Sequence, residues 1–156
     1  ENMKKNLRYF ALLGLTALSL ASCYKECTYA EFIESAKKVE KVEYTKATFS
    51  GKYIYEAAGV TSTLDMGGTE FTNESGNWKP SDSNKVAQSG FGLVLLAFKP
   101  TDVEEDTSGK TKYFYNDGFK VESTEDDKTA IAEWNNFGYL TSFSFNGNTL
   151  TVSYTK

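Results

Sequence analysis

The sequence of 156 residues contains no histidine and only one arginine, Arg8. Without histidine, the chain cannot use an imidazole as a catalytic base or as a metal ligand. With one arginine, it also lacks the guanidinium clamps that hold phosphate or carboxylate groups through two hydrogen bonds. The 40% hydrophobic and 24% charged content excludes a disordered chain and a multi-pass membrane protein. The length indicates a single domain.

The first 22 residues have the pattern of a secretory signal. Lys4, Lys5 and Arg8 form a basic start, residues 9–20 form an apolar run, and small residues follow. The apolar run of about 12 residues is shorter than the roughly 20 that a membrane-spanning helix requires. The sequence therefore predicts that residues 1–22 are a cleaved signal peptide and not a membrane-spanning anchor.

The end of this leader, Leu20-Ala21-Ser22-Cys23, resembles the lipobox of bacterial lipoproteins. The resemblance implies that a peptidase cuts before Cys23 and that the Cys23 thiol carries a diacylglyceryl group. It also implies a further acyl chain, such as palmitate, on the new amino terminus. Because each buried methylene contributes about 0.8 kcal/mol, two or three chains would hold the protein stably on a bilayer. The expected location is the bacterial cell envelope, on the extracytoplasmic side, with no cofactor besides this covalent lipid.

The mature chain is expected to be acidic. Residues 1–22 carry three basic side chains and one acidic side chain, so their removal changes the net charge from −4 to −6. This charge argues against nucleic acid or anionic lipid as a partner and leaves the acyl chains as the membrane contact. Cys27 would be the one unmodified thiol, and it either packs near the first helix or pairs with a second molecule.

Residues 23–27 are expected to be a short lipidated tether, and residues 28–156 a single domain. Thr28 and Glu31 are spaced as a capping box and predict a helix from residue 29 to about 40. A second helix is predicted over residues 82–97, although residues 91–98 are also apolar enough to be a buried strand. Residues 101–110 are expected to form an acidic surface loop.

Alternating apolar and polar residues predict about eight strands. Three near the start should form a meander, at residues 47–56, 60–66 and 69–73. The other five lie near residues 112–115, 119–122, 129–134, 139–145 and 149–154. The predicted fold is α+β: one highly twisted antiparallel sheet with both helices packed on its concave face. The order of the elements loosely resembles the half-barrel of the outer-membrane lipoprotein carrier.

Aromatic residues are the one compositional excess, at 15% of the chain. Trp78, Tyr53 and Tyr55 are the candidates for lining a ligand-binding groove, because aromatic rings line apolar pockets and stack on sugars, peptides and lipid chains. The motifs for phosphate binding, serine acylation and calcium binding are incomplete, so no catalytic residue and no metal ligand is predicted.

Two functions follow from this sequence. The first is a non-catalytic lipoprotein that binds an envelope protein, a host molecule or a small apolar ligand. The second is a carrier or chaperone that holds lipid or a hydrophobic protein segment in a half-barrel cavity. A large apolar cavity would favour the carrier, and a filled core with an exposed aromatic patch would favour the binding module. An enzyme would require a cleft with two carboxylates whose pKa values are shifted in opposite directions.

Overall fold

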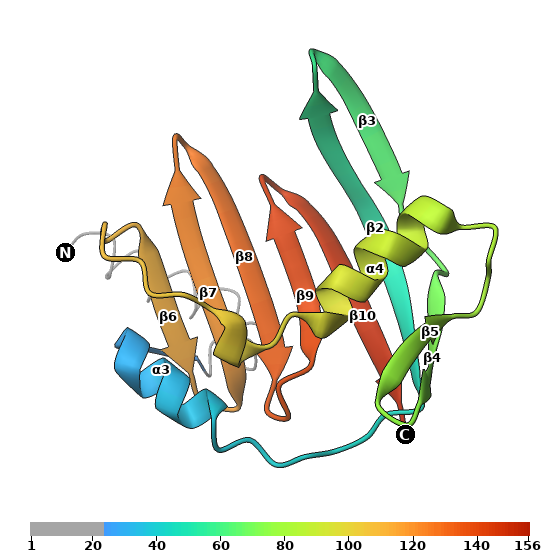
Figure 1. The fold of residues 1–156 in the computed structure, drawn as a ribbon. Coiled ribbons are helices and arrows are strands. Elements are labelled where there is room, and N and C mark those ends of the chain that lie inside the picture. The colour runs from blue at the N-terminus through green and yellow to red at the C-terminus, as the bar shows by residue number, and fades with distance from the viewer. Residues whose placement is uncertain (1–23) are drawn as a thin grey trace, which may run out of the picture.

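The computed structural model describes residues 24–156, which form an open antiparallel sheet with two α-helices against one of its faces (Figure 1). The predicted signal peptide and Cys23 lie outside these residues. The strands are β1 (Lys25–Cys27), β2 (Lys46–Ala57), β3 (Val60–Asp65), β4 (Glu70–Glu74), β5 (Asn77–Pro80), β6 (Thr111–Tyr115), β7 (Gly118–Glu125), β8 (Lys128–Asn135), β9 (Leu140–Phe145) and β10 (Asn148–Thr155). The helices are α3 (Tyr29–Ala36), α4 (Val86–Ala97) and the short 3-10 helix η1 (Pro100–Asp102).

The strands follow the order β1-β6-β7-β8-β9-β10-β2-β4-β5, and β3 also pairs with β2. β1 and β5 lie at opposite ends of this order and do not pair, so the sheet is not closed. The predicted α+β class with a single antiparallel sheet is confirmed. The part of the chain that the structure describes has ten strands rather than eight.

Two short strands were not predicted. Lys25–Cys27, expected to be part of a tether, pairs with residues 113–115 of β6. Asn77–Pro80 pairs with β4 and ends the sheet on the other side. Over so few residues, an alternating pattern is too short to be recognised in a sequence.

The expected meander of the first three strands is wrong, because β4 pairs with β2 and not with β3. Met66 donates its amide hydrogen to the carbonyl oxygen of Gly51, and Gly68 donates to that of Phe49. These bonds keep the chain beside β2 as it passes from β3 to β4. The two strands therefore follow one another along the same edge of β2.

The capping box begins α3 as predicted. The Thr28 hydroxyl accepts the amide hydrogen of Glu31 at 3.1 Å, and the Glu31 carboxylate accepts the amide hydrogen of Thr28 at 3.0 Å. The helix ends at Ala36 rather than near residue 40. Val39 then packs against the core from a segment without helical structure.

The second helix is present, and the alternative of a strand over residues 91–98 is wrong. The helix begins at Val86 rather than at residue 82, because Pro80 belongs to β5. Between them, the Asp82 carboxylate accepts the amide hydrogen of Asn84 at 2.9 Å and holds a turn.

The core lies between the sheet and the two helices. Under α3, the ring of Phe32 packs against those of Phe119 and Trp134, with centroids 5.5 and 6.4 Å apart. Under α4, Phe49 and Phe71 pack against each other, with centroids 5.6 Å apart. All five side chains are at most 1% exposed, so each helix covers its own group of buried rings.

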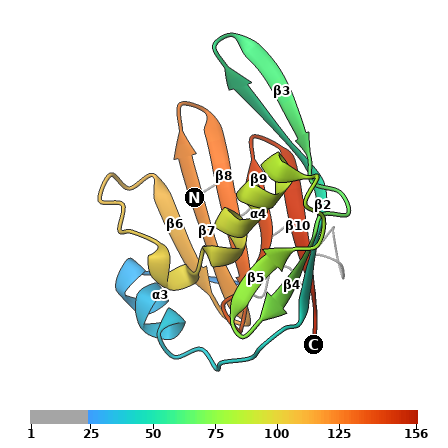
Figure 2. The ribbon, with the colours of Figure 1, turned by 45° about the vertical axis from the view of Figure 1, so that its right-hand side comes forward.

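β2 is a strand of 12 residues whose two halves have different neighbours. Its first half pairs with β10 as far as Gly51, and its second half, Lys52 to Ala57, pairs with β3. Gly51 has a φ of +100°, and a side chain there would collide with the carbonyl oxygen of Thr149 in β10. Glycine is therefore required at this bend. The β2–β3 hairpin projects beyond the turn between β9 and β10, as both ribbon views show (Figures 1 and 2).

Candidate functional site

Two of the three predicted groove residues lie together on the projecting hairpin. The rings of Tyr53 and Tyr55 are stacked, with centroids 5.8 Å apart and planes at 20°. Tyr53 also contacts Phe91 of α4, with a centroid distance of 5.0 Å, and lies 6.4 Å from Phe143 of β9. Tyr53 is half-buried by these contacts, and Tyr55 is 42% exposed. The result is a row of rings that runs from the core to the surface.

A cleft of about 480 Å³ lies between this hairpin and the tip of the β9–β10 hairpin. Residues 53–56 of β2 line one side, and Phe145, Asn146 and Asn148 line the other. The turn at Asn146 and Gly147 has φ values of +52° and +88°, as a tight two-residue hairpin turn requires. This turn ends β9 and β10 early, so the cleft occupies the space where the sheet would otherwise continue.

Trp78 is not part of this cleft. It lies on β5, where its ring contacts Tyr154 at a centroid distance of 6.2 Å. There it lines a separate cleft of about 400 Å³ with Leu93, Lys99 and Tyr139. The structure therefore brings Tyr53 and Tyr55 together and places Trp78 at a second surface.

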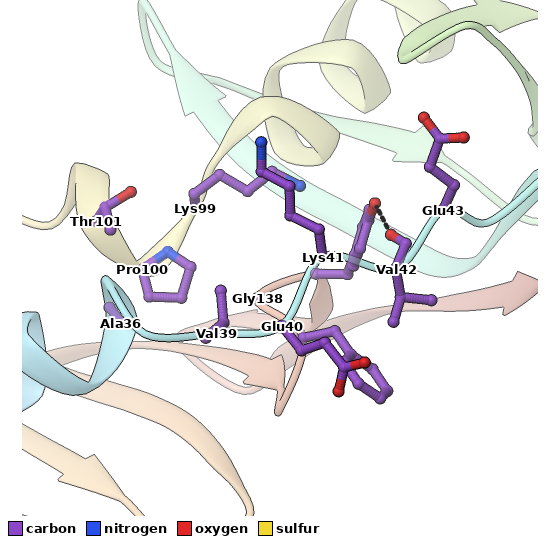
Figure 3. Close-up of a pocket in the computed structure, with 12 residues that line it drawn as sticks. Ala36, Val39, Glu40, Lys41, Val42, Glu43, Lys99, Pro100, Thr101 and Gly138 are labelled. Atoms are coloured by element: carbon purple, nitrogen blue, oxygen red, sulfur yellow. Dashed lines mark hydrogen bonds between the residues drawn. The ribbon is translucent and has the colours of Figure 1, made fainter.

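Lys99 was not predicted as a site residue. It borders the Trp78 cleft and also a neighbouring cleft of about 310 Å³, which Val39 and Pro100 line from two separate segments (Figure 3). The Lys99 ammonium lies 4.0 Å from the centroid of the Tyr139 ring. Burial lowers the pKa of Lys99, and the negative charge of Asp102 partly offsets this effect. A cation beside apolar surface suits a ligand with an anionic group, but no pattern in the sequence pointed to it.

The tyrosines beside Lys99 have structural hydrogen bonds. Tyr139 donates its hydroxyl hydrogen to the carbonyl oxygen of Val42 at 2.6 Å, the bond drawn in Figure 3. Tyr154 donates to the carbonyl oxygen of Leu140, also at 2.6 Å. Burial raises the pKa of both phenols. Their hydroxyl groups therefore fix the segment after α3 and the end of β10, and both are already bonded.

Among residues 24–156, the carboxylates with shifted pKa values are Glu31 and Asp106, and both shifts are downward. Hydrogen bonds from Thr28 lower the pKa of Glu31. The side chain of Ser108, then that of Thr111, lower the pKa of Asp106 to about 2. Both pKa shifts have the same direction, and each arises from a local turn or helix cap. A catalytic acid and base would instead need two carboxyl groups whose pKa values are shifted in opposite directions. Within residues 24–156, no group of three or more Cys, Asp or Glu is arranged to hold a metal ion.

Cys27 packs against the core as part of β1. Burial raises the pKa of its thiol, and the negative charges of Glu31 and Glu26 add to this effect. None of the described helices has the length and apolar character needed to cross a bilayer. Comparison of the chain with protein-family models, with curated proteins and with solved structures finds no match.

Proposed function

We propose that the mature protein is a non-catalytic lipoprotein, anchored through Cys23 on the extracytoplasmic side of a bacterial membrane, whose domain binds a partner at its surface. The single observation that carries the binding role is the packing of α4 directly on the sheet together with the row of aromatic rings that ends at the exposed Tyr55. Rings that are partly buried on one side and open on the other contribute contact area with little loss of side-chain entropy.

The space between α4 and the sheet supports a binding module over a carrier. A β-carbon added at Gly92 would overlap the ring of Phe71, so helix and strand are in direct contact there. Leu95 and Leu96, from the same helix, are at most 5% exposed. The clefts described above are open at the surface and are lined by charged as well as apolar groups. A half-barrel carrier would instead need an apolar cavity at this position.

The position of β1 indicates how close a lipid on Cys23 would hold the domain to the membrane. Lys25 begins this strand, and Cys23 precedes it by two residues. An extended chain spans at most about 3.6 Å per residue, so a lipid on Cys23 would hold the sheet edge within about 7 Å of the attachment point. The domain would then be presented close to the membrane surface, with its β1 edge nearest the lipid.

The anchor is tested by expressing the full chain in bacteria as wild type, Cys23→Ala and Cys27→Ala. We expect wild type and Cys27→Ala to be processed, to gain the mass of two or three acyl chains and to fractionate with membranes. Cys23→Ala should lose all three properties. Equal processing and membrane binding of Cys23→Ala would contradict the proposal.

The binding role is tested by native mass spectrometry of the detergent-extracted wild-type protein. A binding module should show only the mass of the chain and its covalent lipid. A stoichiometric non-covalent lipid would favour the carrier.

A further inference from the structure

The second half of β2 has an open edge. Its pairing with β10 ends at Gly51, and beyond this residue its partner among the described strands is β3, on one side. The opposite side has no partner among the described strands from Lys52 to Ala57, and residues 53–56 line the cleft beside Asn146. Six residues of strand extend over about 20 Å, so this edge is as long as an average strand.

The main-chain groups that face the open edge can be identified from the register. The carbonyl oxygen of Gly51 accepts a hydrogen bond from Met66, on the β3 side. In an antiparallel ladder, successive residues point their N–H and C=O groups to opposite sides. Tyr53 and Tyr55 therefore bond to β3, whereas the N–H and C=O groups of Ile54 and Glu56 point toward the cleft.

The side chains of this edge differ from those of the other open edges. β2 has three consecutive large side chains at residues 53–55, and Ile54 is 39% exposed. β3 has Thr61, Ser62 and Thr63 at its centre and Asp65 at its end, and β5 carries Lys79 and Pro80. Charged residues and proline are the usual means of preventing strand addition at an edge. On the open edge of β2 the charged residues are Lys52 and Glu56, and residues 53–55 between them are uncharged.

We propose that the open edge of β2 binds an extended segment of a partner protein, which adds to the sheet as an antiparallel or parallel strand beside Ile54 and Glu56. This inference deepens the proposed function, because it rests on the domain being a binding module and names the class of partner. Main-chain groups at strand spacing are satisfied by another polypeptide backbone. A sugar or a lipid does not supply such a ladder.

The cleft also defines the side chains that the segment should carry. Successive side chains of an added strand point to opposite faces of the sheet. Every second one would therefore lie on the face of Tyr53, Tyr55 and Phe145, which favours aromatic or branched apolar residues. Glu56 and Lys128 line the cleft with one charge of each sign, so the preferred segment has a low net charge.

The test uses the full-length acylated protein in detergent and a phage-displayed library of linear peptides as the probe. Selected peptides are synthesised, and their backbone amides are methylated one at a time. Strand addition predicts that methylation at every second residue reduces affinity at least tenfold and that methylation at the residues between has little effect. It also predicts slower hydrogen exchange at the amides of Ile54 and Glu56 when the peptide is bound.

Two protein variants distinguish the contribution of the Ile54 amide hydrogen to peptide binding from the contribution of the Ile54 side chain. Ile54→Pro removes an amide hydrogen that faces the open edge and leaves the bonds to β3 in place, as proline permits at an edge. Ile54→Ala removes the side chain and keeps that hydrogen. We expect Ile54→Pro to reduce the affinity for the peptide at least tenfold, and Ile54→Ala to reduce this affinity less. Circular dichroism and the unfolding midpoint establish that both variants are folded.

Four results would overturn the inference and leave the membrane-anchor test unaffected. The first is that the library enriches no peptide. The second is that selected peptides bind folded Ile54→Pro as tightly as wild type, or bind without an alternating effect of methylation. The third is self-association that Ile54→Pro abolishes, because the edge would then pair with a second copy. The fourth is binding of an oligosaccharide panel that Tyr55→Ala abolishes and Ile54→Pro does not, which would identify the aromatic row as a sugar platform.

Discussion

Gly92 of α4 lies directly against the ring of Phe71 of β4. A β-carbon built on Gly92 would come within 2.6 Å of Phe71 Cε1 and even closer to Cζ. Because glycine has no side chain, the helix backbone can rest on the buried ring. This contact brings the helix close to the sheet.

Gly92→Ala should lower the free energy of unfolding by about 1–3 kcal/mol, because the added methyl group forces the helix or the ring to move. Gly90→Ala is the matched control, since a β-carbon there meets no atom within 4 Å. At that helical position alanine should raise stability by about 0.5–1 kcal/mol. Urea unfolding followed by tryptophan fluorescence measures both changes. Equal effects of the two substitutions would contradict the close contact.

Trp134 joins the sheet to the end of α4. Its indole N–H donates to the carbonyl oxygen of Phe98 at 2.8 Å, and the side chain is 0% exposed. Trp134→Phe should cost about 2–4 kcal/mol, because it leaves a cavity and an unpaired buried carbonyl. Trp78→Phe, at a half-buried ring, should cost less than about 1 kcal/mol. Denaturant unfolding would contradict this assignment if Trp78→Phe were the more damaging change.

Asp106 should make stability depend on pH in the acid range. The pKa of its carboxyl group is lowered to about 2 by hydrogen bonds from Ser108 and Thr111, against about 3.9 in an unfolded chain. A lowered pKa contributes stability that is fully present above about pH 4 and is lost as the pH falls through about 2. The stability difference between wild type and Asp106→Asn should therefore shrink as the pH falls from about 5 to 2. A difference that stays constant over this range would show that the carboxylate bonds are not responsible.

Cys27 should react slowly with thiol reagents in the folded protein. Burial, and then the charges of Glu31 and Glu26, raise the pKa of its thiol and so reduce the fraction of reactive thiolate near neutral pH. We expect the rate of modification by a disulfide reagent to increase with pH and to increase sharply in urea. Glu26→Gln should raise the rate modestly in the folded state. A folded-state rate equal to that in urea would contradict this prediction.

The sequence was most informative where local physical chemistry is sufficient. The capping box of Thr28 and Glu31 marked the start of α3, and its two hydrogen bonds form as expected. The alternation of apolar and polar residues located strands near residues 139–145 and 149–154, which pair as the β9–β10 hairpin. These features depend on neighbours within a few residues, so they can be recognised without knowing the fold.

Pairings between distant segments could not be predicted in the same way. The sequence predicted β3 and β4 as successive strands of a meander, but both lie along β2. It offered Trp78 as a neighbour of Tyr53 and Tyr55, but the two sites are on separate surfaces. Lys99 became a candidate site residue only when folding placed it over Tyr139.

The sequence by itself determined the α+β class, the absence of histidine chemistry, and the expectation of a lipid on Cys23. These follow from composition, from periodicity and from a motif of four adjacent residues. The tertiary structure decided that Gly92 of α4 packs directly on Phe71, that Gly51 bends β2 away from β10 and that the edge at Ile54 is open. A strand edge is open or paired according to which other strand lies beside it, and the residues that settle this for β2 are about 100 positions away in the chain.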